Sequence, residues 1–398
     1  MSIWTTLSSW ARRTFTWASA DQRGPSRGSS GESVDASDVL GLSAGLACVR
    51  LIAGTIGTLP LGVYREAGGH KVPVPDHPLW RMLHRAPNSE QTVVDFWEGG
   101  SASLELRGNL VARKIRGVGD RVIALEPMPW DMTQVRRNDV GALVYEYDQE
   151  KYSADEILHV RGFGGSPEGG LSTVAMACET FGLAKATHRA ASGFFRNGVS
   201  TSGLLKYEKK LNPEQRNELE DALQRRYAGA QRSGLPMVLD GDMSWAPTSF
   251  NAEEAQLIES RRMSVEDVCR IFGVPPHMVG HSEKSTSWGT GLEQQTLGFN
   301  KYTLRPRLKR IETALEQQLF TPEDIAKGYS IEFNLEGLLR ADSKGRAEVQ
   351  QIYLQNNVYT INEVRAFEGK GPVPWGDEPW VQQQDVQISR DGSVPPKE

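Results

Sequence analysis

Two histidines in the second half of the chain have the spacing of a metal site. His277 and His281 are four residues apart, and on a helix two imidazoles at that spacing lie on one face and can share a zinc ion. Pro276 and Gly280, however, disfavour a regular helix at this point. No third ligand is adjacent to them, so the pair predicts no metal centre.

A glycine-rich segment, Arg161 to Ser172, has the position of a phosphate-binding loop, because it connects a strand pattern (Ile157 to Val160) to a long helical pattern. Its chemistry does not fit a phosphate. Leu171 occupies the position that should be lysine, and Glu168 would repel the anion. We therefore expect a flexible strand-to-helix joint and no cofactor, and ATP hydrolysis in any process that the protein serves falls to another protein.

The other reactive residues do not form a catalytic pattern. The chain has no nucleophile elbow, no paired-cysteine metal spacing and no carboxylate motif of a nuclease. His77 and His84 lie by a short predicted helix and are interpreted as surface or packing groups. Cys48, Cys178 and Cys269 lie in apolar helical patterns, which predicts buried, reduced thiols. The sequence thus predicts a protein that is not an enzyme.

The run from Gly280 to Gly291 consists mostly of small and hydroxylic side chains. Among its other residues are one acid, one base (Lys284) and one large aromatic residue (Trp288). A helical pattern from Ala255 to Phe272 precedes the run. A longer one from Leu292 to Leu319, interrupted by Pro306, follows it. The run is therefore predicted to be a loop between two helices.

The end of the first of these helices gives an alternative hypothesis. Residues 265–274 resemble the first helix and the turn of a helix-turn-helix module, so residues 265–280 are the basis of a sequence-specific DNA-binding alternative. The second helix of such a module would begin with Pro275-Pro276 and soon meet Gly280. Residues 277–279, which are His, Met and Val, include no Arg, Asn or Gln to read bases.

Length and composition set wider limits. A chain of 398 residues exceeds one ordinary core, so we expect at least two sub-structures. The formal charge of -5 argues against an overall basic surface that grips nucleic acid. No apolar run approaches the roughly 20 residues of a membrane helix, so no membrane partner is expected.

The elements that position these residues form an α+β pattern. Helices are predicted from Ser37 and Asp38 through Ile56, from Pro78 through His84, from Thr92, with Asp95 in a capping box, to Gly108, and from Leu171 to Arg196. Strands are predicted at Leu61–Arg65, Asn109–Ile115, Val122–Glu126, Gln134–Arg136, Ala142–Tyr147 and Tyr329–Leu335. Between two long helices lies a small αβ module, with strands at 203–207, 236–239 and 244–246 and a helix over 213–227.

Several short motifs occur in an order and at a spacing that identify a family. They are Ala47 to Ala53 with Leu59-Pro60-Leu61, His77-Pro78-Leu79 with Ala86-Pro87-Asn88, Gly108-Asn109, Phe194 to Gly198, Ile271 to Pro276, Glu293-Gln294-Gln295, Tyr302 to Pro306 and Asn362 to Arg365. From about Val39 to Val373 the sequence resembles the portal proteins of tailed bacteriophages and related prophages.

The resemblance implies the portal fold, which consists of wing, stem, clip and crown and assembles as a ring. The implied parts are a flexible N-terminal tail (1–33), the wing (34–170), a stem helix (171–198), the clip (199–250), a second stem helix (251–272), the tunnel loop (273–291), the kinked wing helix and strand (292–339), the crown (340–370) and a C-terminal tail (371–398).

It also implies a function, a place and partners. Portal proteins form a ring of twelve at one capsid vertex, through which double-stranded DNA passes without sequence specificity. The implied partners are terminase, the major capsid and scaffolding proteins and a head-tail adaptor, and the implied locations are the virion and, during assembly, the host cytoplasm. The expected channel residues are His281, Lys284, Ser285, Thr286, Ser287 and Trp288, and the expected clip docking surface is Arg216, Glu220, Arg225 and Arg226.

Overall fold

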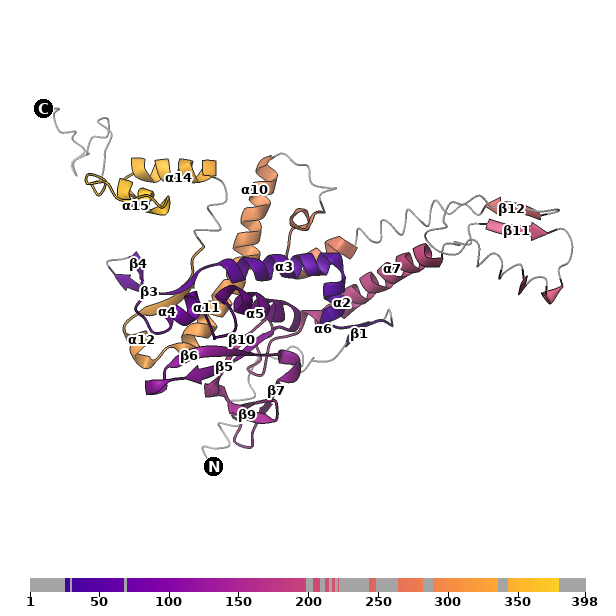
Figure 1. Cartoon of the computed structure of the whole chain (residues 1–398), viewed down its shortest axis with the longest axis horizontal. Helices are drawn as coiled ribbons and strands as arrows, with labels where there is room; N and C mark the ends of the chain where they lie inside the picture. The colour runs from indigo at the N-terminus through magenta and orange to yellow at the C-terminus, as the bar shows by residue number, and fades with distance from the viewer. Residues whose placement is uncertain are drawn as a thin grey trace, which may run out of the picture. The chain divides into compact units, whose positions relative to one another are not determined.

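The computed structural model describes residues 26–28, 31–67, 70–197, 203–207, 212–214, 217–218, 221, 243–247, 264–281, 289–335 and 343–378. The chain divides into two compact units, Met1–Phe333 and Asn334–Glu398 (Figure 1).

The first unit contains α-helices of very different length. They are α2 (Ala36–Gly41), α3 (Ser43–Thr58), α4 (Trp80–His84), α5 (Val93–Arg107), α6 (Thr173–Met176), α7 (Cys178–Asn197), residues 264–272, α10 (Gly289–Gly298), α11 (Arg305–Leu319) and α12 (Pro322–Ala326). Short 3-10 turns are η1 (Val118–Asp120), η2 (Trp130–Met132), η3 (Ala154–Glu156) and η5 (Pro276–Val279), and η6 (Phe299–Leu304) is a π-helix.

The strands of this unit pair in antiparallel fashion. One three-stranded sheet has the order β13 (Tyr329–Phe333), β3 (Leu61–Ala67), β4 (His70–Pro73), and a second has the order β10 (Ile157–Arg161), β5 (Asn109–Arg116), β6 (Val122–Met128). A third consists of β7 (Gln134–Arg137), β8 (Leu143–Tyr147) and β9 (Glu150–Ser153). The two-stranded pairs are β1 (Ser26–Arg27) with β2 (Ser33–Val34) and β11 (Gly203–Tyr207) with β12 (Met243–Pro247).

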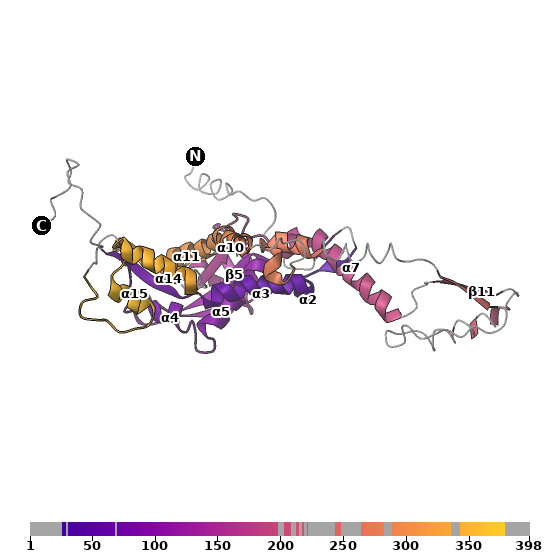
Figure 2. The ribbon, with the colours of Figure 1, turned by 90° about the horizontal axis from the view of Figure 1, so that it is seen from above.

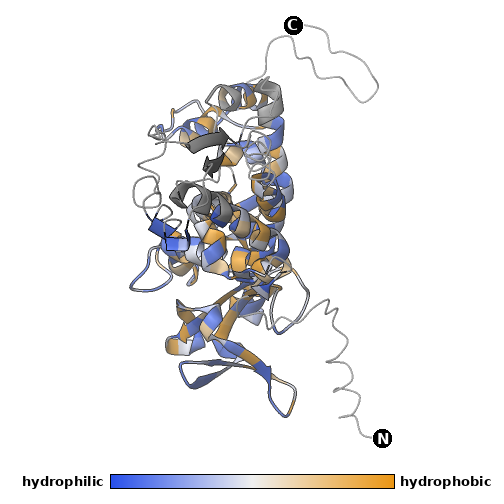
Figure 3. Cartoon of the chain, turned by 90° about the vertical axis from the view of Figure 1, so that its right-hand side faces the viewer, coloured by the Kyte–Doolittle hydropathy of each residue, from blue (hydrophilic) through white to orange (hydrophobic). Residues whose placement is uncertain are grey.

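Helices cover the sheets from two sides. Helix α5 packs against α3 and β5, whereas α11 packs against β10 and β13, and β5 lies between α11 and α5 in Figure 2. Side chains such as Ile52, Trp97, Leu158 and Ile311 are buried between these layers. Most elements carry both hydrophobic and hydrophilic residues (Figure 3), as expected of elements with one buried face.

Local signals explain where α5 begins and ends. Thr92 accepts a hydrogen bond from Asp95 N through its side chain, and the Asp95 carboxylate accepts from Thr92 N, so the predicted capping box is confirmed. At the other end Gly108 has a φ of 73°, a left-handed conformation that favours glycine.

The first predicted helix is divided into α2 and α3. Asp35, rather than Ser37, caps α2, and Leu42 between the two helices has an extended backbone. A Cβ added to Gly45 would overlap the backbone of Val39, so glycine allows the two helices to approach closely at this corner.

The predicted helix from Leu171 to Arg196 is also interrupted. Ser172 caps α6 by accepting from Ala175 N, and its hydroxyl donates to Leu106 O, which attaches this short helix to α5. Ala177 leaves the helical region, and α7 begins at Cys178. The break lies directly after the attached turn.

The glycine-rich segment is a joint, as predicted, but hydrogen bonds hold it in place. Asn109 Oδ1 accepts from Gly170 N at 2.7 Å and Asn109 Nδ2 donates to Gly170 O at 3.0 Å. Gly162 N donates to Gly108 O, and a Cβ on Gly170 would overlap that oxygen. The glycines are needed here for close packing of backbones, not for a phosphate.

The same asparagine supports a buried histidine. His159 Nε2 lies 2.9 Å from Asn109 Oδ1, and His159 Nδ1 lies 2.9 Å from the Tyr145 hydroxyl. Burial, with a smaller effect of the Arg161 charge, holds the pKa of His159 well below its ordinary value. His159 is therefore a neutral structural group.

Part of the expected N-terminal tail forms regular structure. Residues 26–27 and 33–34 pair as β1 and β2, and Lys185 Nζ on α7 donates to Ser33 O at 2.7 Å. The expected tail up to residue 33 therefore includes an ordered strand pair, and residues 1–25 lie outside the described residues.

In the expected clip, β11 and β12 confirm two predicted strands, with Gly203 opposite Pro247. The predicted strand at 236–239 and most of the helix over 213–227 lie outside the described residues.

The described part of the second unit contains the helices α14 (Ser343–Gln355) and α15 (Ile361–Phe367). The rings of Tyr353, Tyr359 and Phe367 pack edge to face. Asn362 Nδ2 donates to Val373 O, and its Oδ1 accepts from Val373 N. The first residues of the predicted C-terminal tail thus pack on α15.

Candidate functional site

Most predicted site residues lie outside the part of the chain that the structure describes. This applies to Lys284, Ser285, Thr286, Ser287 and Trp288 of the expected channel loop and to Arg216, Glu220, Arg225 and Arg226 of the expected clip surface. Of the predicted set, only His281 is described. The candidate site is therefore formed by the described segments on either side of residues 282–288, and we define this loop base as residues 264–281 and 289–307.

The chain enters the loop through a stepwise ending of helix 264–272. Gly273 has a φ of 70°, and Val274 N donates to Cys269 O. Pro275-Pro276 then prevents the helix from continuing, and only the 3-10 turn η5 follows, ended by Gly280 with a φ of 82°.

His281 closes this turn. Its backbone N donates to Pro276 O at 3.0 Å, and its Nε2 lies 3.8 Å from Glu266 Oε1. Within the described ranges, no three His, Cys, Asp or Glu side chains gather as a metal site would require.

The chain leaves the loop through α10, η6 and α11. Pro306 has no N–H to donate to Tyr302 O, which is the i−4 bond that an α-helix would form there. The backbone adopts the π-helix η6 immediately before this proline. The predicted interruption at Pro306 is thus confirmed.

Arg307 connects the two sides of the loop base to the core. Its guanidinium makes two hydrogen bonds to the Glu105 carboxylate, Nε to Oε1 at 2.7 Å and one NH2 to Oε2 at 2.8 Å. The same NH2 donates to Phe272 O at 3.0 Å, and NH1 donates to Thr303 O at 2.8 Å. Glu105 on α5 is only 7% exposed, so this ion pair is largely removed from water.

Further contacts join the same elements. Thr303 Oγ1 donates to Gly273 O at 2.6 Å. The sulfurs of Cys48 on α3 and Cys269 lie 4.0 Å apart, and both thiols are free and buried. The hydrogen bond to Cys269, with burial, raises the pKa of the Cys48 thiol, which keeps this thiol protonated. The predicted buried thiols are confirmed at these two positions, whereas Cys178 is half-buried.

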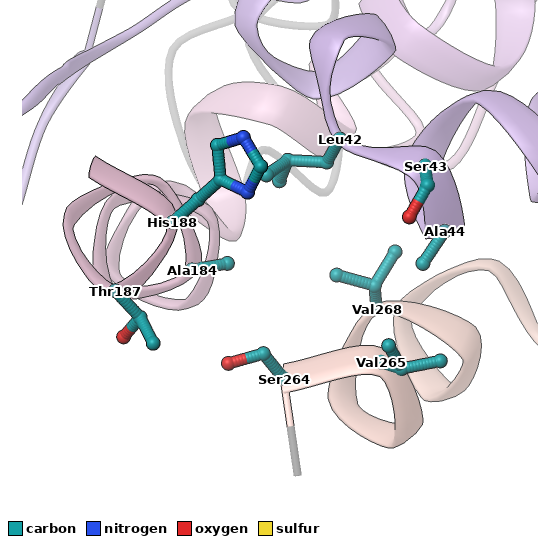
Figure 4. A pocket seen from close by; sticks show the side chains of 9 residues that line it. All are labelled: Leu42, Ser43, Ala44, Ala184, Thr187, His188, Ser264, Val265 and Val268. Carbon is teal, nitrogen blue, oxygen red and sulfur yellow. The ribbon is translucent and has the colours of Figure 1, made fainter. Parts of the chain in front are cut away.

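A small cavity of about 70 Å³ separates α7, the start of α3 and helix 264–272. Figure 4 shows Ala184, Thr187 and His188 from α7, Leu42, Ser43 and Ala44 near the start of α3, and Ser264, Val265 and Val268 from helix 264–272 around it. Its lining includes hydroxyl groups and one imidazole but no carboxylate to orient that imidazole as a base.

The sequence did not predict the Arg307–Glu105 pair. The available signal was Glu105 itself, a carboxylate between Leu104 and Leu106 in the second half of α5. A charge in the buried part of a helix requires a partner. That partner is 202 residues away. The sequence therefore indicates that Glu105 requires a partner but does not identify which residue it is.

The geometry also argues against the helix-turn-helix alternative at residues 265–280. The element after the turn is η5, a 3-10 turn of four residues, whereas a recognition helix must be long enough to lie in the major groove. His77 is a packing group, as predicted, since its ring lies edge to face with Tyr329 and its Nε2 is 3.3 Å from Asp324 Oδ1.

Comparison with known proteins defines the class. The family model described as "Phage portal protein" matches residues 43–369. The portal protein of Enterobacteria phage HK97 is 35% identical over 97% of this chain and 93% of its own length. The chain belongs to the phage portal protein family and is similar to the HK97 type. The helix-turn-helix alternative is not favoured by any of these similarities.

Two solved structures support the fold. The neck of an empty gene transfer agent (GTA) particle, computed with C6 symmetry, matches with a TM-score of 0.61 and 22% identity, over 89% of this chain and 98% of the other. The neck of a native GTA particle, computed with C12 symmetry, matches with a TM-score of 0.56 and 20% identity, over 84% of this chain and 92% of the other.

Membership in the family gives the general role. Portal proteins belong to virion capsids, serve genome packaging and connect head to tail. In the described part of the chain, no helix combines the length and the apolar character that crossing a membrane requires.

Proposed function

We propose that twelve copies of this chain close into a ring at one vertex of a capsid and that double-stranded DNA passes through the ring during packaging and ejection. Family membership and the C12 symmetry of the similar GTA neck support this number. A ring of this kind repeats one head-to-tail contact until it closes. The protein hydrolyses no ATP in this role, and a separate motor supplies the energy.

The observation that carries the proposal is the loop base. Arg307 donates to Glu105, to Phe272 O and to Thr303 O, so both sides of the loop are attached to α5. In a ring, such a base would hold twelve copies of the loop at one radius. Attachment is what a protruding loop needs if passing DNA is not to displace it.

The tunnel loop, with His281 at its base and Lys284, Ser285, Thr286, Ser287 and Trp288 beyond it, is proposed to border the channel. Duplex DNA carries one phosphate charge per roughly 1.7 Å, and each fixed cation that pairs with it strengthens binding. A loop with one lysine and mostly small polar groups suits contacts that form and break as DNA slides. Electron microscopy of the ring tests this, and a loop on the outer wall would contradict it.

The clip, residues 199–250, is proposed to bind terminase during filling and a head-tail adaptor afterwards, while the wing contacts capsid and scaffolding protein. Arg216, Glu220, Arg225 and Arg226 are the proposed docking residues. Replacing Arg225 and Arg226 with glutamate should weaken terminase binding while rings stay intact. Loss of the rings themselves would assign these residues to the subunit interface instead.

The ring is tested first by native mass spectrometry of the purified protein, followed by imaging of the same sample. We expect a species of about 530 kDa, twelve times the 44.0 kDa of one chain, with an open centre. A monomer or dimer that persists after scaffolding protein is added would contradict the proposal. The expected locations are the portal vertex of the virion and, during assembly, the host cytoplasm.

A further inference from the structure

The outer face of the helix that follows the tunnel loop carries an unusual concentration of positive charge. Lys301, Arg305, Lys309 and Arg310 are all exposed, in a chain whose formal charge is -5. Arg305 and Arg310 form no ion pair with another residue in the described part of the chain, and Lys309 pairs with Glu312 at 3.3 Å. Lys301 belongs to η6 and the other three to α11, and we name these four residues the α11 cation row.

The row continues into a cleft between α11 and β10. Arg161 from β10 and Lys309 and Arg310 from α11 line this cleft, together with neutral polar groups such as Thr313 and Gln317. None of its lining residues is an aspartate or a glutamate. Three cations around an open cleft without a carboxylate are an arrangement that attracts an anion.

The electrostatics of the cleft agree with this geometry. Burial of part of the side chain lowers the pKa of Arg310, the neighbouring Arg307 charge lowers it further, and the Glu105 carboxylate offsets part of this. Burial also lowers the pKa of His159 at the edge of the cleft, with a smaller contribution from the Arg161 charge. An anion that entered the cleft would offset the repulsion between these cations.

The spacing of the row favours a polyanion. Arg305 and Lys309 lie four residues apart on α11, about 6 Å along the axis, and Lys301 lies before them in the π-helix η6. Over about 6 Å alone duplex DNA carries roughly three to four phosphate charges. A small anion would occupy the cleft alone and leave the rest of the row unused.

A neighbouring subunit is the alternative partner of the row, because a ring contact could bring an acidic face of the same chain against it. Some exposed acids are paired within their own subunit, such as Asp131 with Arg107 and Glu168 with Arg137. Others, such as Glu126, Asp139 and Asp148, are also exposed, so loss of rings in the variants is the outcome that would indicate a subunit contact.

We propose that the α11 cation row and the β10–α11 cleft bind the phosphate backbone of double-stranded DNA, as a contact separate from the tunnel loop. The inference rests on the proposed function, since it requires DNA to reach the ring. The row adds ionic attraction that the tunnel loop, with its single lysine, does not supply. It provides no base-reading side chains and so remains independent of sequence.

The test uses assembled rings and a fluorescent linear duplex of about 30 bp, with binding measured by anisotropy between about 50 and 200 mM salt. The test variant combines Arg305→Gln, Lys309→Gln and Arg310→Gln. The matched control combines Arg81→Gln, Arg85→Gln and Arg121→Gln, which removes three exposed arginines elsewhere on the chain. Native mass spectrometry confirms rings in every sample.

If each charge of the test variant pairs with one phosphate, the slope of log affinity against log salt becomes less steep by roughly 2.7. The control should keep the slope of the unchanged protein. Arg305→Gln alone should reduce the slope by about 0.9, which gives a readout even if the triple variant assembles poorly.

Equal slopes for all proteins, or equal losses in test variant and control, would overturn the inference. Loss of rings in both Arg305→Gln and the triple variant would also overturn it, because the row would then be a subunit interface. If the unchanged protein forms no rings, the proposed function fails. If rings form but only the predicted slope change is missing, this inference alone fails.

Discussion

Arg307 and Arg310 lie about one helical turn apart on α11, but their side chains have different surroundings. Arg307 points into the core, where it binds a carboxylate and two backbone carbonyls. Arg310 lies on the outer face and makes no ion pair with any other described residue. The comparison shows that residue type alone does not distinguish a structural arginine from a binding arginine. The distinction depends on what surrounds the guanidinium.

The inner face of α11 extends this contrast beyond one residue. Ile311 and Leu315 are fully buried, and Gln318 exchanges hydrogen bonds with the backbone of His159. The outer face presents Thr313 and Gln317 to solvent. We therefore expect substitutions on the inner face to change stability and substitutions on the outer face to change binding.

The largest loss of stability is expected when the buried ion pair between Arg307 and Glu105 is broken. Arg307→Ala leaves the Glu105 carboxylate buried and unpaired, which should lower the free energy of unfolding by about 3–5 kcal/mol. Arg305→Ala, on the outer face of the same helix, should change it by no more than about 0.5 kcal/mol. Denaturant titration of both variants measures this. Equal losses of unfolding free energy would contradict the proposed difference between the two faces of α11.

Truncation of a buried side chain on the inner face should lower the free energy of unfolding by a similar or slightly smaller amount. Leu315 is 0% exposed, and Leu315→Ala should cost about 2–5 kcal/mol through lost burial and the space left behind. The exposed Gln317→Ala should be nearly neutral. Thermal unfolding monitored by circular dichroism measures both, and a stable Leu315→Ala protein would show that α11 does not pack as described.

The buried network beneath α11 should make stability depend on pH. Because the folded-state pKa of His159 is held below its ordinary value of 6.5, the unfolded chain binds a proton where the folded chain does not. Stability is therefore full above about pH 6.5 and falls by about 1.4 kcal/mol per unit as pH decreases, until the folded pKa is reached.

This dependence is measured as the slope of unfolding free energy against pH between about 6.5 and 5.5. His159→Asn should flatten the slope, whatever its effect on absolute stability. His188→Gln, which removes an exposed histidine on α7, serves as control and should leave the slope as it is. A slope unchanged in His159→Asn would assign the dependence to other groups.

The smallest effect is expected at the second attachment of the loop base. Thr303→Val removes the hydrogen bond from Thr303 Oγ1 to Gly273 O and should cost about 1 kcal/mol. If the attachment positions the loop, hydrogen exchange at Gly273 and Val274 should increase in this variant more than in Thr313→Ala. Equal exchange in the two variants would show that Arg307 alone is sufficient.

Local patterns predicted most elements of the first unit. The Thr92–Asp95 capping box, the left-handed Gly108 and the interruption at Pro306 each depend on groups within about four residues, so the sequence displays them directly. The strands β3, β5 to β8 and β10 to β13 follow from short hydrophobic patterns. The strands β1, β2, β4 and β9 and the division of the long helices were not among the predicted elements.

The candidate site was predicted as a segment and not as a set of contacts. The sequence placed a loop between two helices, and its order of motifs identified the portal family. It did not show that Arg307 reaches Glu105 or that Cys48 lies beside Cys269. These partners are separated by 202 and 221 residues.

The sequence by itself therefore determined the family, the order of elements and most of their local ends, because these depend on neighbouring residues and on motifs in a fixed order. Only the tertiary structure decided which charges are buried and which remain free on α11. That choice depends on which distant elements pack against each face of the helix, since desolvation and pairing are properties of the assembled core.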